Sequence, residues 1–149
     1  MTANNEFTST ELGTDVQLDD VMEAFEVLDD WEDRYAYIVE LGRKLPPFPA
    51  AERTEENFVQ GCQSQVWLTH FREPDTGKLF FLIESDAIIV KGLAAIVLVA
   101  LNARTPDEVL AVDVDEVFKR IDLFRHISPT RGNGLRSMVA RIQGVAAQA

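Results

Sequence analysis

The sequence predicts a single α+β domain in which a small three-stranded antiparallel sheet packs against helices. Three observations lead to this prediction. The chain has 149 residues, a length that suits one domain with a sizeable core. Apolar residues recur at helical spacing in its N-terminal and C-terminal parts, whereas two runs near its centre have the pattern of strands. We find neither an internal repeat nor a second domain boundary, so these elements belong to one unit.

Acidic residues are concentrated at the N-terminus. The first 33 residues contain eleven acidic and no basic side chains, whereas the rest of the chain contains 14 of each. We therefore do not expect the basic face that binding to nucleic acid or to an anionic membrane requires. Residues 1–17 are polar with scattered apolar side chains, and we expect them to form a disordered acidic tail before a domain over residues 18–149.

The sequence has no pattern typical of a membrane or secreted protein. Its longest apolar run, Leu93–Leu101, has nine residues, about half of the length that crosses a bilayer. The N-terminus has neither the basic nor the apolar region of a signal peptide. We therefore expect a soluble protein of the cytoplasm.

Two helices are expected after the tail. The first has apolar residues at helical spacing over residues 18–28, with Asp and Glu on its other face. Asp29 or Asp30 can cap the second helix, whose apolar stripe covers residues 31–45. Prolines at positions 46, 47 and 49 end this helix and begin an extended linker.

The predicted sheet follows this linker. Phe58 and Val59 indicate a short first strand. Residues 66–71 alternate between two faces, and residues 78–83 form a run rich in Phe, Leu and Ile. The turn at residues 73–77 contains Pro and Gly and is short enough to join these two strands as an antiparallel hairpin.

Helices are expected in the rest of the chain. Residues 86–102 are apolar almost all round a helix, which is typical of the buried centre of a domain. Thr105 to Glu108 forms a capping box with proline at the first helical position. Asp113 begins another short helix, and Ser128 with Pro129 begins the last one.

Cys62 is the single cysteine of the chain. One thiol cannot form an intramolecular disulfide, a redox pair of cysteines, or a zinc or iron–sulfur site that needs several cysteines. Only His70 and His126 could join it as soft ligands, and nothing in the sequence indicates that they converge. We therefore expect no metal site, and any sulfur chemistry must use this thiol and a second molecule.

The residues alone leave several interpretations of Cys62 open. A lone cysteine is often a buried, inert side chain. Its neighbours Gln60, Gly61 and residues 63–65 are instead typical of an exposed turn, whose backbone N–H groups would lower the pKa of a thiol. A cysteine–histidine hydrolase would need a base within hydrogen-bond reach, and no spacing in the sequence indicates one.

Four segments of the chain resemble, in order, the SufE family of cysteine desulfuration proteins. They are residues 34–46, 57–67, 85–93 and 128–135, and the most specific of them contains Gly-Cys-Gln-Ser-Gln-Val-Trp at residues 61–67. The resemblance extends from residue 18 to the C-terminus. It implies the α+β fold that this family shares with iron–sulfur scaffold proteins.

The resemblance also implies a function. In the family the loop cysteine accepts sulfane sulfur from a pyridoxal-phosphate (PLP) cysteine desulfurase, raises the turnover of that enzyme and passes the sulfur to an iron–sulfur cluster scaffold. By position, Cys62 is the acceptor, and Gly61 and Gln63 support its loop. Asp86 and Arg131 match positions associated with the loop and the partner surface.

The resemblance thus implies a sulfur carrier that acts with a desulfurase rather than a stand-alone enzyme. Such a carrier binds no cofactor itself and has neither nucleic acid nor a membrane as a partner. The alternative is a non-catalytic binding module that activates the desulfurase allosterically and whose cysteine is structural.

Overall fold

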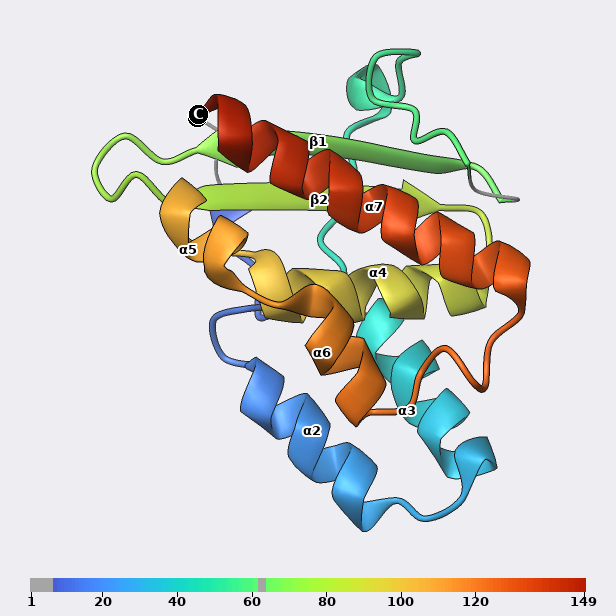
Figure 1. The fold of residues 1–149 in the computed structure, drawn as a ribbon. Coiled ribbons are helices and arrows are strands. Elements are labelled where there is room, and N and C mark those ends of the chain that lie inside the picture. The colour runs from blue at the N-terminus through green and yellow to red at the C-terminus, as the bar shows by residue number, and fades with distance from the viewer. Residues whose placement is uncertain (1–6, 62–63) are drawn as a thin grey trace.

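The computed structural model describes residues 7–61 and 64–149 (Figure 1). Within this part the chain runs through two helices, a short 3₁₀ helix, a β-hairpin and four further helices, which make an α+β fold. The elements are α2 Leu18–Val27, α3 Trp31–Gly42, η1 Ala50–Glu52, β1 Val66–Arg72, β2 Leu79–Ser85, α4 Ile88–Leu101, α5 Pro106–Ala111, α6 Val114–Arg120 and α7 Pro129–Gln148.

Helix α4 is the centre of the hydrophobic core, as its apolar sequence predicts. Eleven of its 14 residues are buried, and it packs against α3, α7 and β2. Helices α3 and α4 lie so close together that a Cβ atom on Gly92 would collide with the carbonyl oxygen of Ile38. On the facing helix, a Cβ atom on Gly42 would lie 2.8 Å from the backbone nitrogen of Gly92. No helix in the described part of the chain, α4 included, is long and apolar enough to cross a membrane.

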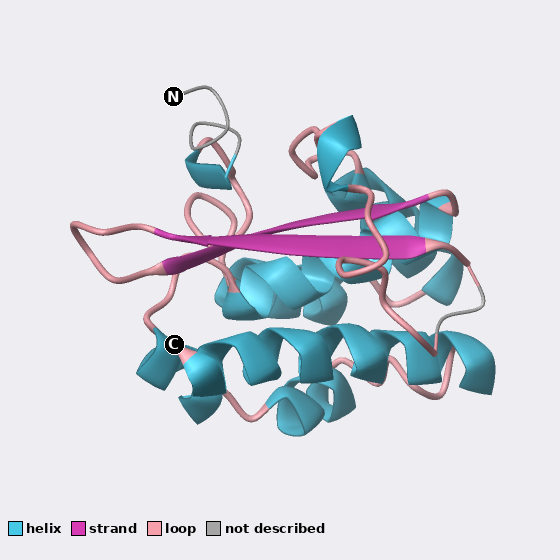
Figure 2. Cartoon of the chain, turned by 90° about the horizontal axis from the view of Figure 1, so that it is seen from above, coloured by secondary structure: helices cyan, strands magenta, loops and turns pink. Residues whose placement is uncertain are grey.

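The β-hairpin is covered on both faces. Strands β1 and β2 pair antiparallel along their whole length. Alternate residues of β2 from Leu79 to Ile83 face the main core, whereas Phe80 and Leu82 form a second cluster with Phe7 and Phe48. Figure 2 shows α4 and α7 on one side of the sheet and the N-terminal segment on the other. This double coverage explains why β2 is a continuous apolar run rather than an alternating one.

The predicted third strand is wrong within the described residues. Phe58 forms only an isolated antiparallel bridge with Trp67, supported by the hydrogen bond from the Val59 N–H to the Val66 carbonyl at 2.9 Å. The pairing does not continue before Phe58, because the chain turns there. The Asn57 side chain holds this turn by donating to the carbonyl of Glu52 at 2.8 Å. The observed sheet therefore has two strands.

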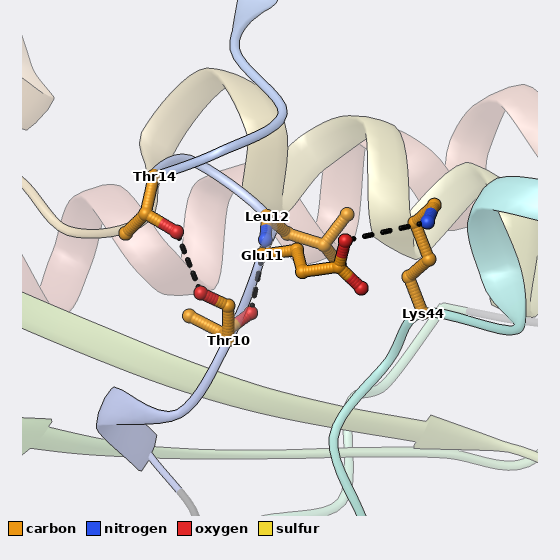
Figure 3. A network of polar contacts seen from close by, with 5 residues as sticks. All are labelled: Thr10, Glu11, Leu12, Thr14 and Lys44. Carbon is orange, nitrogen blue, oxygen red and sulfur yellow. Dashed lines mark hydrogen bonds and ion pairs between the residues drawn. The ribbon is translucent and has the colours of Figure 1, made fainter.

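The expectation of a disordered tail over residues 1–17 is also wrong where the structure describes this segment, from residue 7 onward. Leu12 is fully buried, and its carbonyl accepts a hydrogen bond from the buried Asn102 side chain at 3.1 Å. Figure 3 shows the polar contacts around it: the Leu12 N–H and the Thr14 hydroxyl both donate to Thr10, and Glu11 pairs with Lys44 at 3.5 Å. The segment is held by tertiary contacts, which its polar composition does not reveal.

The helix starts agree with the capping residues that the sequence indicates. Asp30 caps α3, and its side chain accepts a hydrogen bond from a backbone N–H of the first turn at 3.0 Å. Thr105 and Glu108 form the predicted reciprocal capping box at α5. Asp113 and Ser128 cap α6 and α7. These four starts are local, so sequence alone places them.

Candidate functional site

The loop of the predicted sulfur acceptor joins two arms that the structure describes. Cys62 and Gln63 themselves lie outside the described residues, and the described part of the site consists of their neighbours. We call residues 56–61 the first arm and residues 64–66 the second arm. The hydrogen bond between Val59 and Val66 joins the arms at the base of the loop. The side chains that hold the arms come from the junction between β2 and α4 and from α7.

Gly61, at the end of the first arm, adopts a backbone conformation that favours glycine. Its φ is +89°, in the left-handed region that residues with a Cβ atom adopt only with strain. A Cβ atom at this position would also lie 2.7 Å from Oγ of Ser137 on α7. The backbone conformation therefore favours glycine here, and a side chain at this position would also force the Ser137 hydroxyl to move.

Asp86 holds the second arm. Its Oδ1 accepts a hydrogen bond from the backbone N–H of Gln65 at 3.2 Å. Asp86 does not cap α4, because the residue at the cap position is Ala87, whose N–H donates to the Ser85 hydroxyl at 3.2 Å. The carboxylate is thus directed to the loop and lies at the junction between β2 and α4.

Arg141, which no motif of the sequence singles out, holds the first arm. Its guanidinium donates to the carbonyl of Phe58 at 3.2 Å and also to the carbonyl of Glu56. The residue lies in α7 and is partly buried. The sequence nevertheless contains an indication that Arg141 needs a partner, because this residue follows Met138 by three residues and precedes Val145 by four. It therefore lies beside the apolar stripe of the helix, where a cation needs a partner.

Arg131 lies in the first turn of α7, and its backbone N–H donates to the Ser128 hydroxyl at 3.2 Å. Within the described residues its guanidinium makes neither a hydrogen bond nor an ion pair. Arg131 and Ser64 line a small pocket of about 50 Å³. The other walls of this pocket come from α4 and α7: Val90, Leu93, Thr130, Gly134, Leu135 and Met138. The structure thus brings Arg131 and the second arm to one small pocket with both polar and apolar walls.

The two histidines lie in separate surroundings. His70 is exposed on β1, but partial desolvation by the neighbouring protein lowers its pKa, and the positive charge of Arg141 lowers it further. His126 stacks on Trp31 with ring centroids 3.9 Å apart, and its Nε2 lies 3.5 Å from a carboxylate oxygen of Asp122. Among the side chains that the structure describes, no three His, Cys, Asp or Glu residues are grouped so that they could hold a metal ion.

The fold and the held loop define a small α+β domain that presents one loop at its end. The family model SufE, described as an Fe-S metabolism associated domain, matches residues 19–146. The chain therefore belongs to the SufE family, as the resemblance of its four segments indicates. Family membership associates it with iron–sulfur metabolism and, in general terms, with sulfur transfer alongside a cysteine desulfurase.

Relatives cover almost the whole domain. The chain is 48% identical over 131 residues to an uncharacterized SufE-like protein of Rhizobium meliloti strain 1021. The aligned region covers 87% of this chain and 94% of that protein. It is 48% identical over 128 residues to another from Rhizobium etli, covering 85% and 86%. A solution structure of a hypothetical protein from Thermus thermophilus is similar, with a TM-score of 0.73, 26% identity, and coverage of 89% of this chain and 94% of that one.

Proposed function

We propose that this chain accepts sulfur on Cys62 from a PLP-dependent cysteine desulfurase and passes it to an iron–sulfur cluster scaffold. In the first step the Cys62 thiolate attacks the outer sulfur of a persulfide on the desulfurase. An S–S bond forms on Cys62 as the S–S bond of the donor breaks, and the donor cysteine leaves as a thiolate. The persulfide proton moves with the transferred sulfur, so the step needs neither an oxidant nor a reductant.

The observation that supports this proposal most directly is that both arms of the loop are held from outside. Arg141 binds backbone carbonyls of the first arm, and Asp86 binds a backbone N–H of the second. A loop with fixed arms can present the only thiol of the chain to a partner in a defined orientation. A second cysteine is not needed, because the exchange ends with a persulfide on the acceptor rather than with a disulfide.

The neighbours of the loop have supporting roles in this proposal. Arg131 is a permanent cation near the loop, suited to stabilise a thiolate or persulfide anion. Gly61 and Gln63 shape the loop around the acceptor. The pocket lined by Ser64 and Arg131, whose apolar walls include Leu93 and Met138, offers the loop partial shelter between transfers. A reducing compartment such as the cytoplasm keeps a single thiol free, and we propose this location.

Intact mass spectrometry tests the transfer. After the chain is mixed with a purified cysteine desulfurase and cysteine, we expect a gain of about 32 Da per transferred sulfur. Cys62→Ser should abolish this gain and leave the far-UV circular dichroism and the melting temperature unchanged. Sulfur gained by the serine variant would contradict the proposal. Unfolding of the variant would instead assign Cys62 to the buried, structural class.

Desulfurase kinetics separate sulfur transfer from purely allosteric activation. If the chain were a non-catalytic module, Cys62→Ala would still raise cysteine turnover fully in the absence of reductant. We expect the stimulation to be lost, because the persulfide on the desulfurase then has no acceptor. Full stimulation by this variant would favour the allosteric alternative.

A further inference from the structure

A larger pocket lies on the other face of the start of α4. Ile88 and Lys91 line it, whereas Val90 and Leu93 of the same helix line the small pocket beside Ser64. Helical periodicity directs these two pairs to opposite faces. The larger pocket, which we call the Ile88 pocket, has a volume of about 350 Å³, enough for an apolar side chain or a small ligand. The transfer step proposed above does not use it.

The walls of the Ile88 pocket are apolar except for Arg43, Glu84 and Lys91, and the exposed side chain of Ile88 lines it as well. Its apolar walls come from α3, the proline-containing linker and the end of β2, and they include Val39, Leu45, Phe48 and Ile83. Ile88 is 68% exposed, which is unusual for a large aliphatic residue beside a pocket. An exposed apolar residue next to an apolar depression is typical of a protein–protein contact.

The charges around the pocket are mainly positive, although the protein has a net charge of −11. Arg43 and Lys91 both line it and are exposed, and Arg43 also forms an exposed ion pair with Glu40 at 3.3 Å. Lys91 makes no ion pair within the described residues, and the nearby carboxylate of Glu84 is already paired with Arg53. Helix α4 begins at Ile88, and its cap residue Ala87 provides no side-chain cap, so the positive end of the helix dipole adds to these charges. An acidic segment would therefore be attracted here and repelled by most of the remaining surface.

The Ile88 pocket lies at the end of the molecule where sulfur transfer would occur. Asp86, which binds Gln65 of the second arm, is only two residues before Ile88. Figure 1 shows the start of β1, the end of β2 and the starts of α4 and α7 at one end of the molecule. Direct exchange between two sulfur atoms requires contact, so the donor must cover this end.

We infer that the Ile88 pocket receives an apolar side chain from an acidic segment of the desulfurase that donates the sulfur. This inference rests on the proposed function. The apolar side chain fills the pocket against Ile88, and the flanking carboxylates pair with Lys91 and Arg43. The contact fixes the donor on the surface beside the loop, so that the persulfide reaches Cys62.

Binding measurements with matched variants test this inference. Ile88→Asp introduces a carboxylate at the pocket in the first turn of α4, where the helix dipole favours an acidic residue, so the fold should be retained. Lys91→Glu reverses the charge. We expect each substitution to raise the Kd for the desulfurase about tenfold. The effect of Lys91→Glu should diminish at high salt. Val27→Asp is the control, because Val27 is 76% exposed and lies at the far end of α2.

Sulfur transfer from a small donor separates this inference from the proposed function. Glutathione persulfide needs no docking surface, so both pocket variants should accept its sulfur at the wild-type rate. If wild-type protein gains no sulfur on Cys62 from either donor, the proposed function fails. If it gains sulfur and both pocket variants bind the desulfurase as tightly as Val27→Asp does, the docking inference alone is overturned. If the wild-type protein sediments as a dimer and Ile88→Asp sediments as a monomer, the pocket binds a second copy of the chain, and the docking inference is likewise overturned.

Discussion

Asp86 and Gln65 are joined by a hydrogen bond that connects the β2–α4 junction to the predicted sulfur-acceptor loop. The Oδ1 atom of Asp86 lies 3.2 Å from the backbone nitrogen of Gln65. A backbone N–H in a loop has no strand partner of its own, so a carboxylate that accepts from it restricts the loop directly. The bond is exposed, and its loss would therefore affect the loop more than the global stability.

Asp86→Ala should expose the acceptor loop without unfolding the protein. Removing one exposed hydrogen bond to a charged group costs about 1 kcal/mol locally, which corresponds to roughly fivefold faster alkylation of Cys62 by iodoacetamide. Asp86→Asn keeps an oxygen acceptor and should stay close to wild type. Wild-type alkylation kinetics in Asp86→Ala would show that this bond does not restrict the thiol.

The elements that depend on local sequence are the ones that the sequence predicts well. The alternation of β1, the apolar run of β2 and the four capped helix starts all follow from neighbouring residues. The third strand was overpredicted, because Phe58 and Val59 have strand-forming side chains but Asn57 is held in a turn by Glu52. The pattern of apolar residues in the sequence cannot reveal this competing hydrogen bond between Asn57 and Glu52.

The features that the sequence does not reveal depend on distant partners. Leu12 packs in the main hydrophobic core, and its carbonyl accepts a hydrogen bond from Asn102, 90 positions away. Arg141 binds carbonyls 83 and 85 positions upstream, and a backbone carbonyl leaves no mark in the sequence. Asp86 was found only through the resemblance to a family, since its acceptor role concerns a backbone N–H 21 positions upstream.

Arg141→Lys should loosen the first arm of the loop. Lysine keeps the positive charge but lacks the planar fork that donates to two carbonyls at once. We expect a loss of about 1–2 kcal/mol in the free energy of unfolding and slower sulfur acceptance by Cys62. Arg136→Lys is the matched control, because Arg136 lies on the same helix but its contacts, an exposed ion pair with Asp115 and a cation–π contact with the ring of Phe124, do not involve the loop. Equal effects of the two substitutions would contradict a specific role of Arg141.

The lowered pKa of His70 makes a small part of the stability dependent on pH. Partial desolvation is its main cause and Arg141 the second, so the unfolded chain binds the proton more readily than the folded chain. The stability that neutral His70 contributes is complete above its unfolded pKa of about 6.5 and decreases as the pH falls below that value. Denaturant unfolding of His70→Gln should therefore show a smaller loss of stability on acidification than wild type does. Parallel curves for the two proteins would refute this.

Two glycines in helices should respond in opposite directions to replacement by alanine. At Gly92 the added Cβ atom would collide with the carbonyl oxygen of Ile38, so Gly92→Ala should force α3 and α4 apart and cost about 1–3 kcal/mol. At Gly144 on α7 nothing lies within 4 Å of the added Cβ atom. Gly144→Ala should therefore stabilise the protein by about 0.5–1 kcal/mol through the higher helix propensity of alanine. Thermal melts of both variants measure this contrast, and a Gly92→Ala variant as stable as wild type would contradict the close packing of α3 on α4.

Gly61→Ala should impair sulfur acceptance more than it impairs folding. The substitution places a Cβ atom where φ is +89° and where Oγ of Ser137 would lie 2.7 Å away. The backbone strain at this positive φ alone costs about 1–2 kcal/mol. Because the loop is exposed, it can relieve this strain by shifting, without unfolding of the core. Ser137→Gly in the same chain removes the contact but leaves the backbone strain. Mass spectrometry of sulfur acceptance, compared with thermal melts, should therefore show a large loss for Gly61→Ala and partial recovery for the double variant. Full recovery would assign the whole effect to the contact with α7, whereas wild-type acceptance in Gly61→Ala would show that the conformation of Gly61 does not orient Cys62 for transfer.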